Sequence, residues 1–494
     1  MFFLFLLTEC QITTEDSQRK NFPNIIYILA DDMGYGDISA LNPDSKIPTP
    51  NMDQLAREGM VFTDAHSPSA VCTPTRYGVL TGRYCFRTRL QSGVLVGHSP
   101  SLIEPGRMTV ATLLKDAGYR TACIGKWHLG LDFKKKDIEK PLISGDGWTK
   151  TITSNVDYSA RIDGGPSDLG FDYSFILPSS LDIQPYFYIR NEYVVNTDIV
   201  PIEGSPDERS QGKFWREGDA SRDFDFYQVL PDFTDEAINF ISDHLNTYSG
   251  EPFFLYLALA APHTPWVPME EFLGQSEAGL YGDFVVQVDH SVGEVLRTLE
   301  DLGRKDNTLV IFTSDNGAYW WPENIQEFDH HANHIFSGMK SDLWEGGHHI
   351  PFLARWPDKI IPGTKSDQLV CLTDLLATSA DIIGKELPYH AGEDSFSHLP
   401  AMMGEKDYPG ARNQLVMQSF NGSYAIRKEN WKLIFARGSG GWTYEGEPDD
   451  PEIQLYNLDE DIKEQKNLYE KYPDIVNELS EKLEMYKNER RSRF

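Results

Sequence analysis

Cysteine is scarce in this chain, with five residues in 494, and this excludes a small scaffold stapled by disulfides. No apolar run approaches the ~20 residues of a membrane-spanning helix, so no transmembrane span is predicted. Positive charge is also in deficit, because 45 lysines and arginines face 75 aspartates and glutamates, a formal charge of −30. A field of that sign repels phosphate backbones and argues against nucleic acid as a partner, although one local basic pocket could still bind a small anion.

Apolar residues make up 40% of the chain and aromatic residues 12%, enough for a sizeable core and for two or three domains. The first 21 residues are different in character. Residues 2–7 are apolar, and Cys10 precedes a polar stretch, as at the end of a lipoprotein signal. Glu9 stands where a small residue is typical, and no basic residues come first. We predict a signal or lipoprotein remnant over residues 1–21 with a possible lipid anchor at Cys10; the alternative is an apolar segment without a role.

Short apolar runs alternate with amphipathic stretches over the first two-thirds of the chain, which is typical of βαβ units and a mainly parallel sheet. Four runs read as buried central strands: residues 24–29, 120–124, 253–259 and 309–313. Helical patterns occur between them at residues 52–58, 110–117, 235–245 and 281–302. We therefore predict an α/β domain over residues 22–400, in which helices sandwich a mixed, mostly parallel sheet.

The pattern changes after about residue 387. Shorter alternating segments at 414–420, 423–427 and 431–436 read as antiparallel strands joined by tight turns at residues 421–422 and 428–430. A closing helix is predicted at residues 475–490. These features predict a small C-terminal α+β subdomain over residues 401–494.

Polar side chains follow each of the four predicted central strands. In an open α/β sheet, ligands bind beyond the carboxyl ends of the strands, so these side chains are expected along one edge. They are Asp31 and Asp32, Lys126 and His128, His263, and Asp315 and Asn316.

The two acidic pairs offer four hard oxygen donors, and no cysteine or histidine accompanies them in a zinc-type spacing. Such a set favours Ca²⁺ or Mg²⁺ over a soft metal. Each pair alone has an ordinary structural explanation, since Asp31-Asp32 could cap a helix and Asp315-Asn316-Gly317 could form a turn. Two such pairs at the ends of two buried strands favour the metal.

Several short motifs follow one another in a characteristic order. They are NIIYILADDMGYGD at 24–37, CTPTR at 72–76, LTGR at 80–83, GKWHLG at 125–130, APHTP at 261–265, TSDNG at 313–317, and GMK and WEGG within 338–347. With this set the chain resembles the type I, formylglycine-dependent sulfatases of the alkaline phosphatase superfamily, most nearly the arylsulfatase A-like bacterial enzymes that desulfate polysaccharides. The phrase LYNLD at 455–459 extends the resemblance over nearly the whole chain.

The resemblance implies that Cys72 is converted to formylglycine by a formylglycine-generating or an anaerobic sulfatase-maturating enzyme. The hydrated aldehyde would attack sulfur with one hydroxyl, and the second hydroxyl would then expel sulfate and regenerate the aldehyde. A serine could not perform this last step. The alternative for Cys72 is a buried core thiol, but its polar, proline-containing surroundings are unlike a core segment.

The resemblance also assigns roles to individual residues. It implies that a cation, Ca²⁺ in preference to Mg²⁺, is bound by Asp31, Asp32, Asp315, Asn316 and residue 72. Arg76 would steady the hydrate, Lys126 would contact sulfate and His128 would be the base. His263 and Lys340 would bind sulfate and protonate the leaving oxygen, and Ser180 would also touch the site. One departure is His349, where many relatives have arginine; it leaves the catalytic set intact.

Specificity for the substrate is expected on loops outside the sulfate pocket. Aromatic and polar side chains together suit a sugar ring. The richest candidates are Trp320 and Trp321 with Tyr319, followed by His330, His331 and His334. The loop at 91–101 with His98, and Trp266, are further candidates; packing is the alternative for each. Relatives with this combination of motifs suggest a sulfated galactose or N-acetylgalactosamine.

Two other functions remain open from the residues. A phosphate or phosphonate ester hydrolase of the same superfamily could use the same lysines and histidines. A catalytically inactive sulfatase-like protein could bind sulfated glycans, but it should lack a ligand or a base, and neither is missing. A sulfated polysaccharide or glycosaminoglycan as substrate implies a periplasmic or extracellular location.

Overall fold

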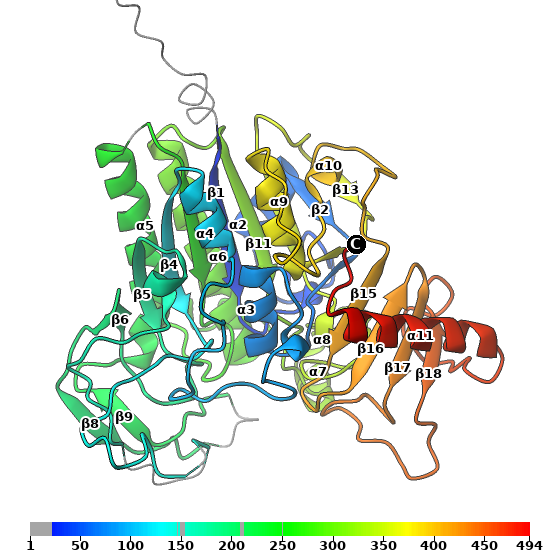
Figure 1. Cartoon of the computed structure of the whole chain (residues 1–494), viewed down its shortest axis with the longest axis horizontal. Coiled ribbons are helices and arrows are strands. Elements are labelled where there is room, and N and C mark those ends of the chain that lie inside the picture. Colours follow the sequence, from blue (N-terminus) through cyan, green and yellow to red (C-terminus); the bar gives the residue numbers. More distant parts are fainter. Residues whose placement is uncertain (1–21, 146, 149–153, 208–211, 249) are drawn as a thin grey trace, which may run out of the picture.

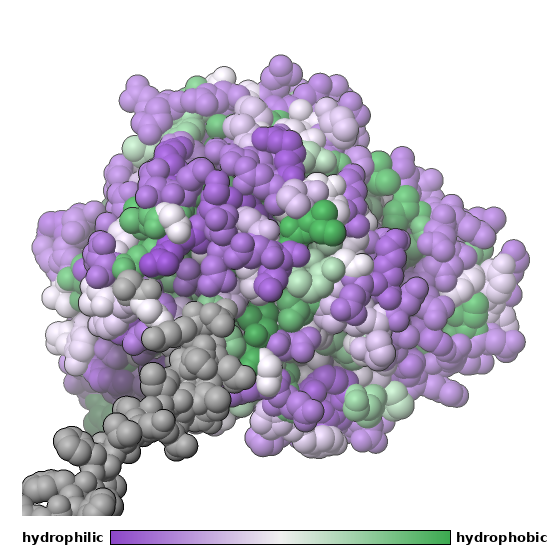
Figure 2. Space-filling model, turned by 90° about the horizontal axis from the view of Figure 1, so that it is seen from above, coloured by the Kyte–Doolittle hydropathy of each residue, from purple (hydrophilic) through white to green (hydrophobic). Residues whose placement is uncertain are grey.

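The computed structural model describes residues 22–494, except 146, 149–153, 208–211 and 249. The predicted signal segment and Cys10 therefore lie outside the described residues. Figure 1 shows a layered domain, drawn in blue to yellow, beside a smaller orange and red unit. Figure 2 looks at the molecule from above the view of Figure 1, and hydrophilic residues cover most of that face, as expected for a chain of this net charge.

Ten strands form one mixed sheet. In spatial order they are β13 (Thr364–Ser366), β2 (Met60–Phe62), β12 (Phe352–Arg355), β11 (Thr308–Ser314), β1 (Asn24–Ala30), β10 (Phe253–Ala258), β4 (Arg120–Lys126), β5 (Tyr173–Leu177), β6 (Ile189–Arg190) and β7 (Tyr193–Val194). The five central strands, from β11 to β5, run parallel, whereas β12 and β6 run antiparallel on either side. The central strands are almost wholly apolar because both faces of the sheet are covered.

Helices cover both faces of this sheet (Figure 1). The helices on one face are α3 (Cys72–Thr81), α4 (Val110–Asp116) and α9 (Leu375–Ile382), and α10 (Leu399–Met402) joins the same core. On the other face lie α2 (Pro50–Glu58), α5 (Val229–Thr247) and α6 (Gly279–Asp301). Two short helices, α7 (Pro322–Phe328) and α8 (Glu345–His348), follow β11.

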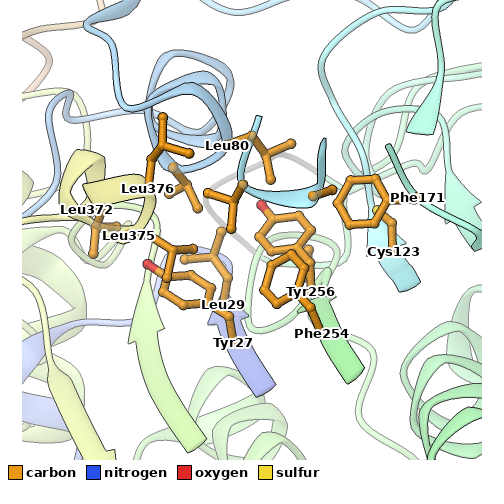
Figure 3. Packing of buried hydrophobic residues seen from close by; sticks show 14 of the residues in the cluster. Tyr27, Leu29, Leu80, Cys123, Phe171, Phe254, Tyr256, Leu372, Leu375 and Leu376 are labelled. Carbon is orange, nitrogen blue, oxygen red and sulfur yellow. The ribbon is translucent and has the colours of Figure 1, made fainter. Parts of the chain in front are cut away.

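The alternation of side chains along the strands divides the core into two layers. Tyr27 and Leu29 of β1 point into the layer under α3 and α9, while Ile26 and Ile28 point into the layer under α5 and α6. Figure 3 shows the first layer, where Tyr27, Leu29 and Tyr256 lie against Leu80 of α3 and the leucines of α9. This double covering fixes the position of the strand ends.

The C-terminal unit is an antiparallel sheet with one helix across it. The sheet order is β15 (Gln414–Gln418), β16 (Tyr424–Lys428), β17 (Trp431–Phe435) and β18 (Gln454–Asn457). The helix α11 (Pro473–Glu489) packs on one face through Leu479, Leu483 and Tyr486. Residues of the other face pack on Leu343 and Cys371 of the large domain. The remaining strands pair off separately as β3 (Ala65–His66) with β14 (Val370–Cys371), and β8 (Ile199–Ile202) with β9 (Gly218–Ser221).

The predicted fold class is confirmed: a large, mostly parallel sheet between helices, and a small antiparallel unit. All four central strands and the four helices between them are present, with α5 beginning six residues earlier than predicted. The domain boundary at residue 400 stays a prediction; residues 401 and 402 belong to the core of the large domain, and β15 starts at Gln414. Within the described residues, four cysteines are buried and unpaired, and no helix is both long and apolar enough for a membrane span.

Candidate active site

The carboxyl ends of β11, β1, β10, β4 and β5 meet at one edge of the sheet, and the polar residues predicted from the sequence gather there. Asp31 and Asp32 follow β1, Lys126 ends β4, and Asp315 and Asn316 follow β11. His128, His263 and Ser180 lie just beyond β4, β10 and β5. All eight side chains are buried. The parallel centre of the sheet therefore brings together residues that are almost 300 positions apart in the chain.

Cys72 is the first residue of α3, and the helix presents it to this edge of the sheet. All ten residues of α3 are buried, and its last turn closes at Gly82, whose φ of 64° suits glycine. A side chain at the first position of a helix lies in the positive field of the helix dipole, which stabilises developing negative charge. Burial raises the pKa of the Cys72 thiol, so the unmodified residue is a poor thiolate nucleophile.

Asp31 and Asp315 are held by buried cations from two elements. The ammonium of Lys126 lies 2.8 and 2.7 Å from the two carboxylate oxygens of Asp31. The guanidinium of Arg76 donates to Oδ2 of Asp315 at 2.7 and 3.0 Å and lies 3.4 Å from Asp31. Burial alone would raise the pKa of Asp31, but the charges of Lys126 and Arg76 hold it well below its usual range. Burial raises the pKa of Asp315 to about 7, against the effect of Arg76.

Asp32 is the centre of a second set of contacts. Lys340 Nζ and Asn316 Nδ2 each lie 2.7 Å from one oxygen of Asp32, and His263 Nε2 lies 3.6 Å away. Asp32 itself has a positive φ of 65°, an uncommon backbone geometry that places its side chain beside Asp315 and Asn316. Three carboxylates are thus balanced by three cations in a region without exposed side chains.

The two histidines of the site are neutral near neutral pH. Burial, reinforced by Lys340, lowers the pKa of His263 to about 4. Burial and Lys126 hold the pKa of His128 well below its usual range. Nε2 of His128 bonds the carbonyl of Leu95 at 2.8 Å, and its Nδ1 has no hydrogen-bond partner among the described residues. A neutral ring with a free nitrogen can accept a proton from a ligand in the cavity.

The oxygen donors fit a divalent cation. Asn316 directs its Nδ2 towards Asp32 and the carbonyl of Gly317, because the opposite orientation would set its amide oxygen against a carboxylate. This leaves Oδ1 of Asn316 buried and without a hydrogen-bond partner in the described part of the chain. Asp31, Asp315 and Cys72 also present ligand atoms within 4.8 Å of one another. An unsatisfied amide oxygen beside three buried carboxylates is the donor set of a hard cation.

A cavity of about 240 Å³ opens above these residues. Its polar walls include Cys72, His128, Ser180, His263 and Lys340. The rest of its lining, called the outer wall below, is of another kind, with a carboxylate and guanidinium pair and several aromatic rings. These residues are Asp182, Arg216, Trp148, Phe420 and Trp442. The carboxylate is buried and lies 4.0 Å from His263 Nδ1.

Comparisons with known proteins agree with this arrangement. The family model described as Sulfatase matches residues 23–385, and a model of the N-sulphoglucosamine sulphohydrolase C-terminal region matches residues 339–489. The chain belongs to the sulfatase family. It is 34% identical to an N-acetylgalactosamine-6-O-sulfatase of Bacteroides thetaiotaomicron, over 98% of this chain and 97% of that one. It is 33% identical to the N-acetylgalactosamine-6-sulfatase of Mus musculus, over 77% of this chain and 66% of the relative.

A solved structure from work on glycosaminoglycan metabolism by Bacteroides thetaiotaomicron is also similar. It superposes with a TM-score of 0.80 and 33% identity, covering 95% of this chain and 100% of the other. The family implies a formylglycine and a divalent cation, and the residues described above suit both. This sulfatase is therefore a sulfuric ester hydrolase.

The structure brings the predicted catalytic and metal-ligating residues into one site, but two of them, Arg76 and Lys126, do not border the cavity. Arg76 lies beneath it, bonded to Asp315, Asp31 and the carbonyl of Lys126. The ammonium of Lys126, predicted to contact sulfate, is bonded to Asp31. Ser180, which the resemblance assigns to the site, lies 3.2 Å from Lys126 Nζ and 3.3 Å from the ring nitrogens of His263.

The residues predicted to bind sugar are placed elsewhere. Trp320 is 3% exposed and packs between Trp266 and Tyr281 in the core, so it offers no face to a ligand. His330 is fully buried and bonded to Asp37 at 2.8 Å. The prediction for these two residues is wrong. The loop that follows β11 packs their side chains into the core, so they cannot contact a ligand. Trp321 and His331 keep some exposure but do not border the cavity.

The other two candidates for sugar binding are also structural. Trp266 belongs to the core beside Tyr281, and His98 is buried in a chain of hydrogen bonds to Tyr158 and Gln184. The sequence analysis did not predict the residues that line the outer wall of the cavity. Asp182 and Trp148 come from irregular loops, and Phe420 and Trp442 come from the C-terminal unit. Asp182 lies two residues after the predicted Ser180 in the sequence, and this proximity was the one available signal.

Proposed function

We propose that this sulfatase removes the 6-O-sulfate from a galactose or N-acetylgalactosamine residue of a glycosaminoglycan-type polysaccharide. The observation that carries the proposal is the cavity, which has a sulfate-binding floor and a sugar-sized outer wall. The full-length similarity to an N-acetylgalactosamine-6-O-sulfatase supports the choice of sugar and position. A cavity of about 240 Å³ holds one monosaccharide with its ester group, and this favours recognition of a single sugar unit.

The proposed nucleophile is a formylglycine made from Cys72 by a separate maturating enzyme. When hydrated, this group supplies a hydroxyl that attacks sulfur and a second hydroxyl that allows sulfate to leave. The position of residue 72 at the start of α3, facing the cavity, supports the assignment. Arg76 and Lys126 fix Asp31 and Asp315 beside it, so neither carboxylate needs to reorganise during turnover.

The remaining residues bind the ester and move protons. Lys340 and His263 line the cavity and are placed to bind the ester, and the ammonium of Lys340 can donate to the leaving oxygen. His128 is neutral and has a free Nδ1, which suits a base that takes a proton from residue 72. Ser180, bonded to both Lys126 and His263, keeps these two groups in a fixed relation.

We propose Ca²⁺ as the cation, held by Asp31, Asp32, Asp315 and Asn316. When bound it would supply positive charge that favours an anionic ester and acidifies a hydroxyl. Ca²⁺ accepts an irregular set of oxygen ligands more readily than Mg²⁺, which keeps several waters and demands octahedral geometry. The crowded, fully buried carboxylates leave little room for such waters.

Recognition of the sugar is assigned to the outer wall. Arg216 bonds Asp182 at 2.6 Å, and its guanidinium lies 5.1 Å from the Trp148 ring centroid. A carboxylate and a guanidinium offer acceptors and donors for sugar hydroxyls, and Trp148 and Trp442 offer apolar faces for the ring. This division leaves the floor of the cavity to the sulfate and the rim to the sugar.

The direct test is a substrate panel with the matured protein. We expect the highest kcat/KM on N-acetylgalactosamine 6-sulfate or galactose 6-sulfate, and lower values on the 4-sulfate and on N-acetylglucosamine 6-sulfate. An aryl phosphate should be turned over slowly, and a Cys72→Ala variant should turn over none of them. A preference for the 4-sulfate would overturn the assigned position, and faster hydrolysis of the phosphate would favour the phosphate or phosphonate ester hydrolase.

We also propose that the protein works in the periplasm or outside the cell, anchored through Cys10. A polysaccharide substrate and the apolar segment before Cys10 support this location. Cell fractionation of the full chain and a Cys10→Ala variant tests it. We expect the variant to move from the membrane to the soluble fraction; equal distribution of the two proteins would contradict the anchor.

A further inference from the structure

One buried carboxylate of the large domain holds the loop between β17 and β18, residues 436–453, which carries Trp442 into the outer wall. Asp342 is fully buried. Its Oδ1 accepts from the hydroxyl of Ser439 at 2.8 Å, and from the backbone N–H groups of Trp442 and Thr443 at 2.8 and 3.2 Å. Its Oδ2 accepts from the hydroxyl of Thr443. Four hydrogen bonds therefore tie this loop to a single side chain.

The same carboxylate closes the turn that carries Lys340. Oδ2 of Asp342 accepts from the N–H of Met339 at 2.9 Å, and the N–H of Asp342 donates to the carbonyl of Met339 at 3.0 Å. Lys340 also has contacts of its own, since its N–H donates to the carbonyl of Ala318 at 3.0 Å and its ammonium lies 2.7 Å from Asp32. Asp342 is thus joined to the turn of Lys340, but these two contacts of Lys340 do not depend on it.

The residue between Lys340 and Asp342 is fixed from both sides. Ser341 has a φ of 88°, which is uncommon for a residue with a side chain. Its N–H donates to the carbonyl of Ala70 at 2.7 Å, and its carbonyl accepts from the N–H of Phe420 at 3.2 Å. Such a backbone conformation persists where the surrounding contacts determine it. The turn at 339–342 therefore touches both the segment that leads to α3 and the outer wall.

Asp342 serves these partners as an acceptor. Three N–H groups and two hydroxyls point at its two oxygens, and only a carboxylate accepts from all five at once. Burial raises the pKa of this carboxyl group, and the donors oppose the effect. An asparagine at this position would offer one acceptor oxygen, and its amide N–H groups would face some of the same donors.

The loop lies directly on the turn. Gly441 precedes Trp442, and a Cβ atom at Gly441 would lie 2.4 Å from the carbonyl oxygen of Ser341 and 2.5 Å from Oδ1 of Asp342. Groups packed this closely move together, so a displacement at Asp342 is transmitted to the Trp442 ring. Trp442 and Lys340 border the same cavity, one in the outer wall and the other beside the sulfate-binding floor.

We propose that Asp342 is a positioning residue that sets the separation between Lys340, which binds the ester group, and Trp442, which meets the sugar ring. A sulfate on C6 stands one bond further from the ring than a sulfate on a ring carbon. A fixed separation distinguishes the two esters, because only one of them satisfies both contacts at once. The inference rests on the proposed function, which assigns the outer wall to the sugar.

The test is a double-variant cycle of the matured protein with Asp342→Ala, Trp442→Ala and both together. The substrates are the sulfated sugar preferred in the panel and a small aryl sulfate. We expect Asp342→Ala to lower kcat/KM at least about fivefold on the sugar and less than about threefold on the aryl ester, since Lys340 keeps its bonds to Ala318 and Asp32. In the Asp342→Ala background, loss of the Trp442 ring should cost less than about twofold more, because the ring is already displaced.

The position of the ester gives a second readout. The preference for the favoured sulfate ester over its positional isomer, measured as a ratio of kcat/KM values, should fall at least about threefold in Asp342→Ala. Tyr444→Phe is the matched control, because it removes an exposed hydrogen bond to Asp450 from the same loop. Its ratios should match those of the wild type.

A purely structural role for Asp342 predicts a different pattern. Both substrates would then lose activity equally, the preference between isomers would be unchanged, and the losses of the two single variants would multiply in the double variant. Each of these results would overturn the inference. If Asp342→Ala fails to fold, Asp342→Asn decides; it should lower the ratio of sugar to aryl kcat/KM at least about twofold, and an unchanged ratio would count against the inference.

The single variants separate this inference from the proposed function. A lower ratio in Trp442→Ala with an unchanged ratio in Asp342→Ala would overturn the role of Asp342 and leave the outer wall as the site of sugar recognition. An unchanged ratio in Trp442→Ala would contradict the assignment of the outer wall itself.

Discussion

Replacement of Trp442 by alanine tests whether the outer wall of the cavity recognises the sugar. The ring lies in that wall, with Tyr319 edge-on to it at 6.0 Å and Phe420 tilted against it at 5.0 Å between centroids. Because these neighbours hold the ring in place, it loses little conformational entropy when a ligand binds. An aromatic face covered by a sugar is worth about 1–3 kcal/mol, taking the burial of an apolar side chain as the measure. The loss therefore predicts a reduction in kcat/KM of about 5- to 150-fold on a sulfated sugar.

The assay is the ratio of kcat/KM on N-acetylgalactosamine 6-sulfate to kcat/KM on a small aryl sulfate. An aryl sulfate has a good leaving group, so its hydrolysis depends less on binding energy from contacts away from sulfur. We therefore expect kcat/KM on the aryl sulfate to change less than about threefold. Trp320→Phe is the matched control, because Trp320 is buried in the core and should leave the ratio unchanged. The reasoning is refuted if Trp442→Ala leaves the ratio intact, or if Trp320→Phe lowers it.

Three other predictions concern the floor of the cavity and its rim. A peptide containing residue 72 should be about 18 Da lighter than its cysteine form in active protein, and Cys72→Ser should be at least ~10³-fold slower; a fully active, unmodified protein would contradict this. Exhaustive chelation should abolish turnover, and Ca²⁺ should restore it. Bound Ca²⁺ should also raise the Tm, because it reduces the repulsion between the buried carboxylates. Full activity without a divalent ion would exclude the cation. Asp182→Asn should lower kcat/KM on the sugar by about 10-fold or more through the lost charged hydrogen bond, with the aryl sulfate as control; equal losses on both substrates would place Asp182 in the sulfate pocket.

The stability of the protein should also report the buried carboxylate Glu464. Its pKa is raised above the unfolded value, so the folded state binds the proton more tightly, and the free energy of unfolding falls as pH rises from about 4.3 to about 7. Thermal unfolding at several pH values should show this fall in the wild type and a smaller one in Glu464→Gln. An identical slope in both proteins would mean that Glu464 is already ionised at pH 5.

The centre of the fold could be predicted because its strands are apolar on both faces. After Asn24 the run at residues 25–29 is apolar throughout, and β1 indeed lies between two parallel neighbours. The strands on the β13 side of the sheet escaped prediction because β2, β12 and β13 are only three or four residues long and their pairing depends on contacts distant in sequence. The short strand β18 was missed for the same reason, because a loop of eighteen residues separates it from its partner β17.

The residues of the site also divide into those that could be predicted from the sequence and those that could not. Residues directly after strands, such as Asp31 and Asp315, could be placed because the sheet rule fixes where strand ends lie. The role of Trp320 could not be predicted. An aromatic side chain beside a site can face either the ligand or the core, and here its packing against Tyr281 places it in the core. Trp442 could not be found either, since it reaches the cavity from the loop between β17 and β18 of the C-terminal unit, and no local pattern marks that approach.

The most direct test of the account is the release of sulfate from N-acetylgalactosamine 6-sulfate by the matured protein, followed by ion chromatography and by mass analysis of residue 72 in the same sample. The account predicts stoichiometric sulfate and desulfated sugar, with formylglycine at position 72 and no release by Cys72→Ala. Release of sulfate by the Cys72→Ala variant, or no release from any sulfated sugar by protein that carries formylglycine, would contradict it.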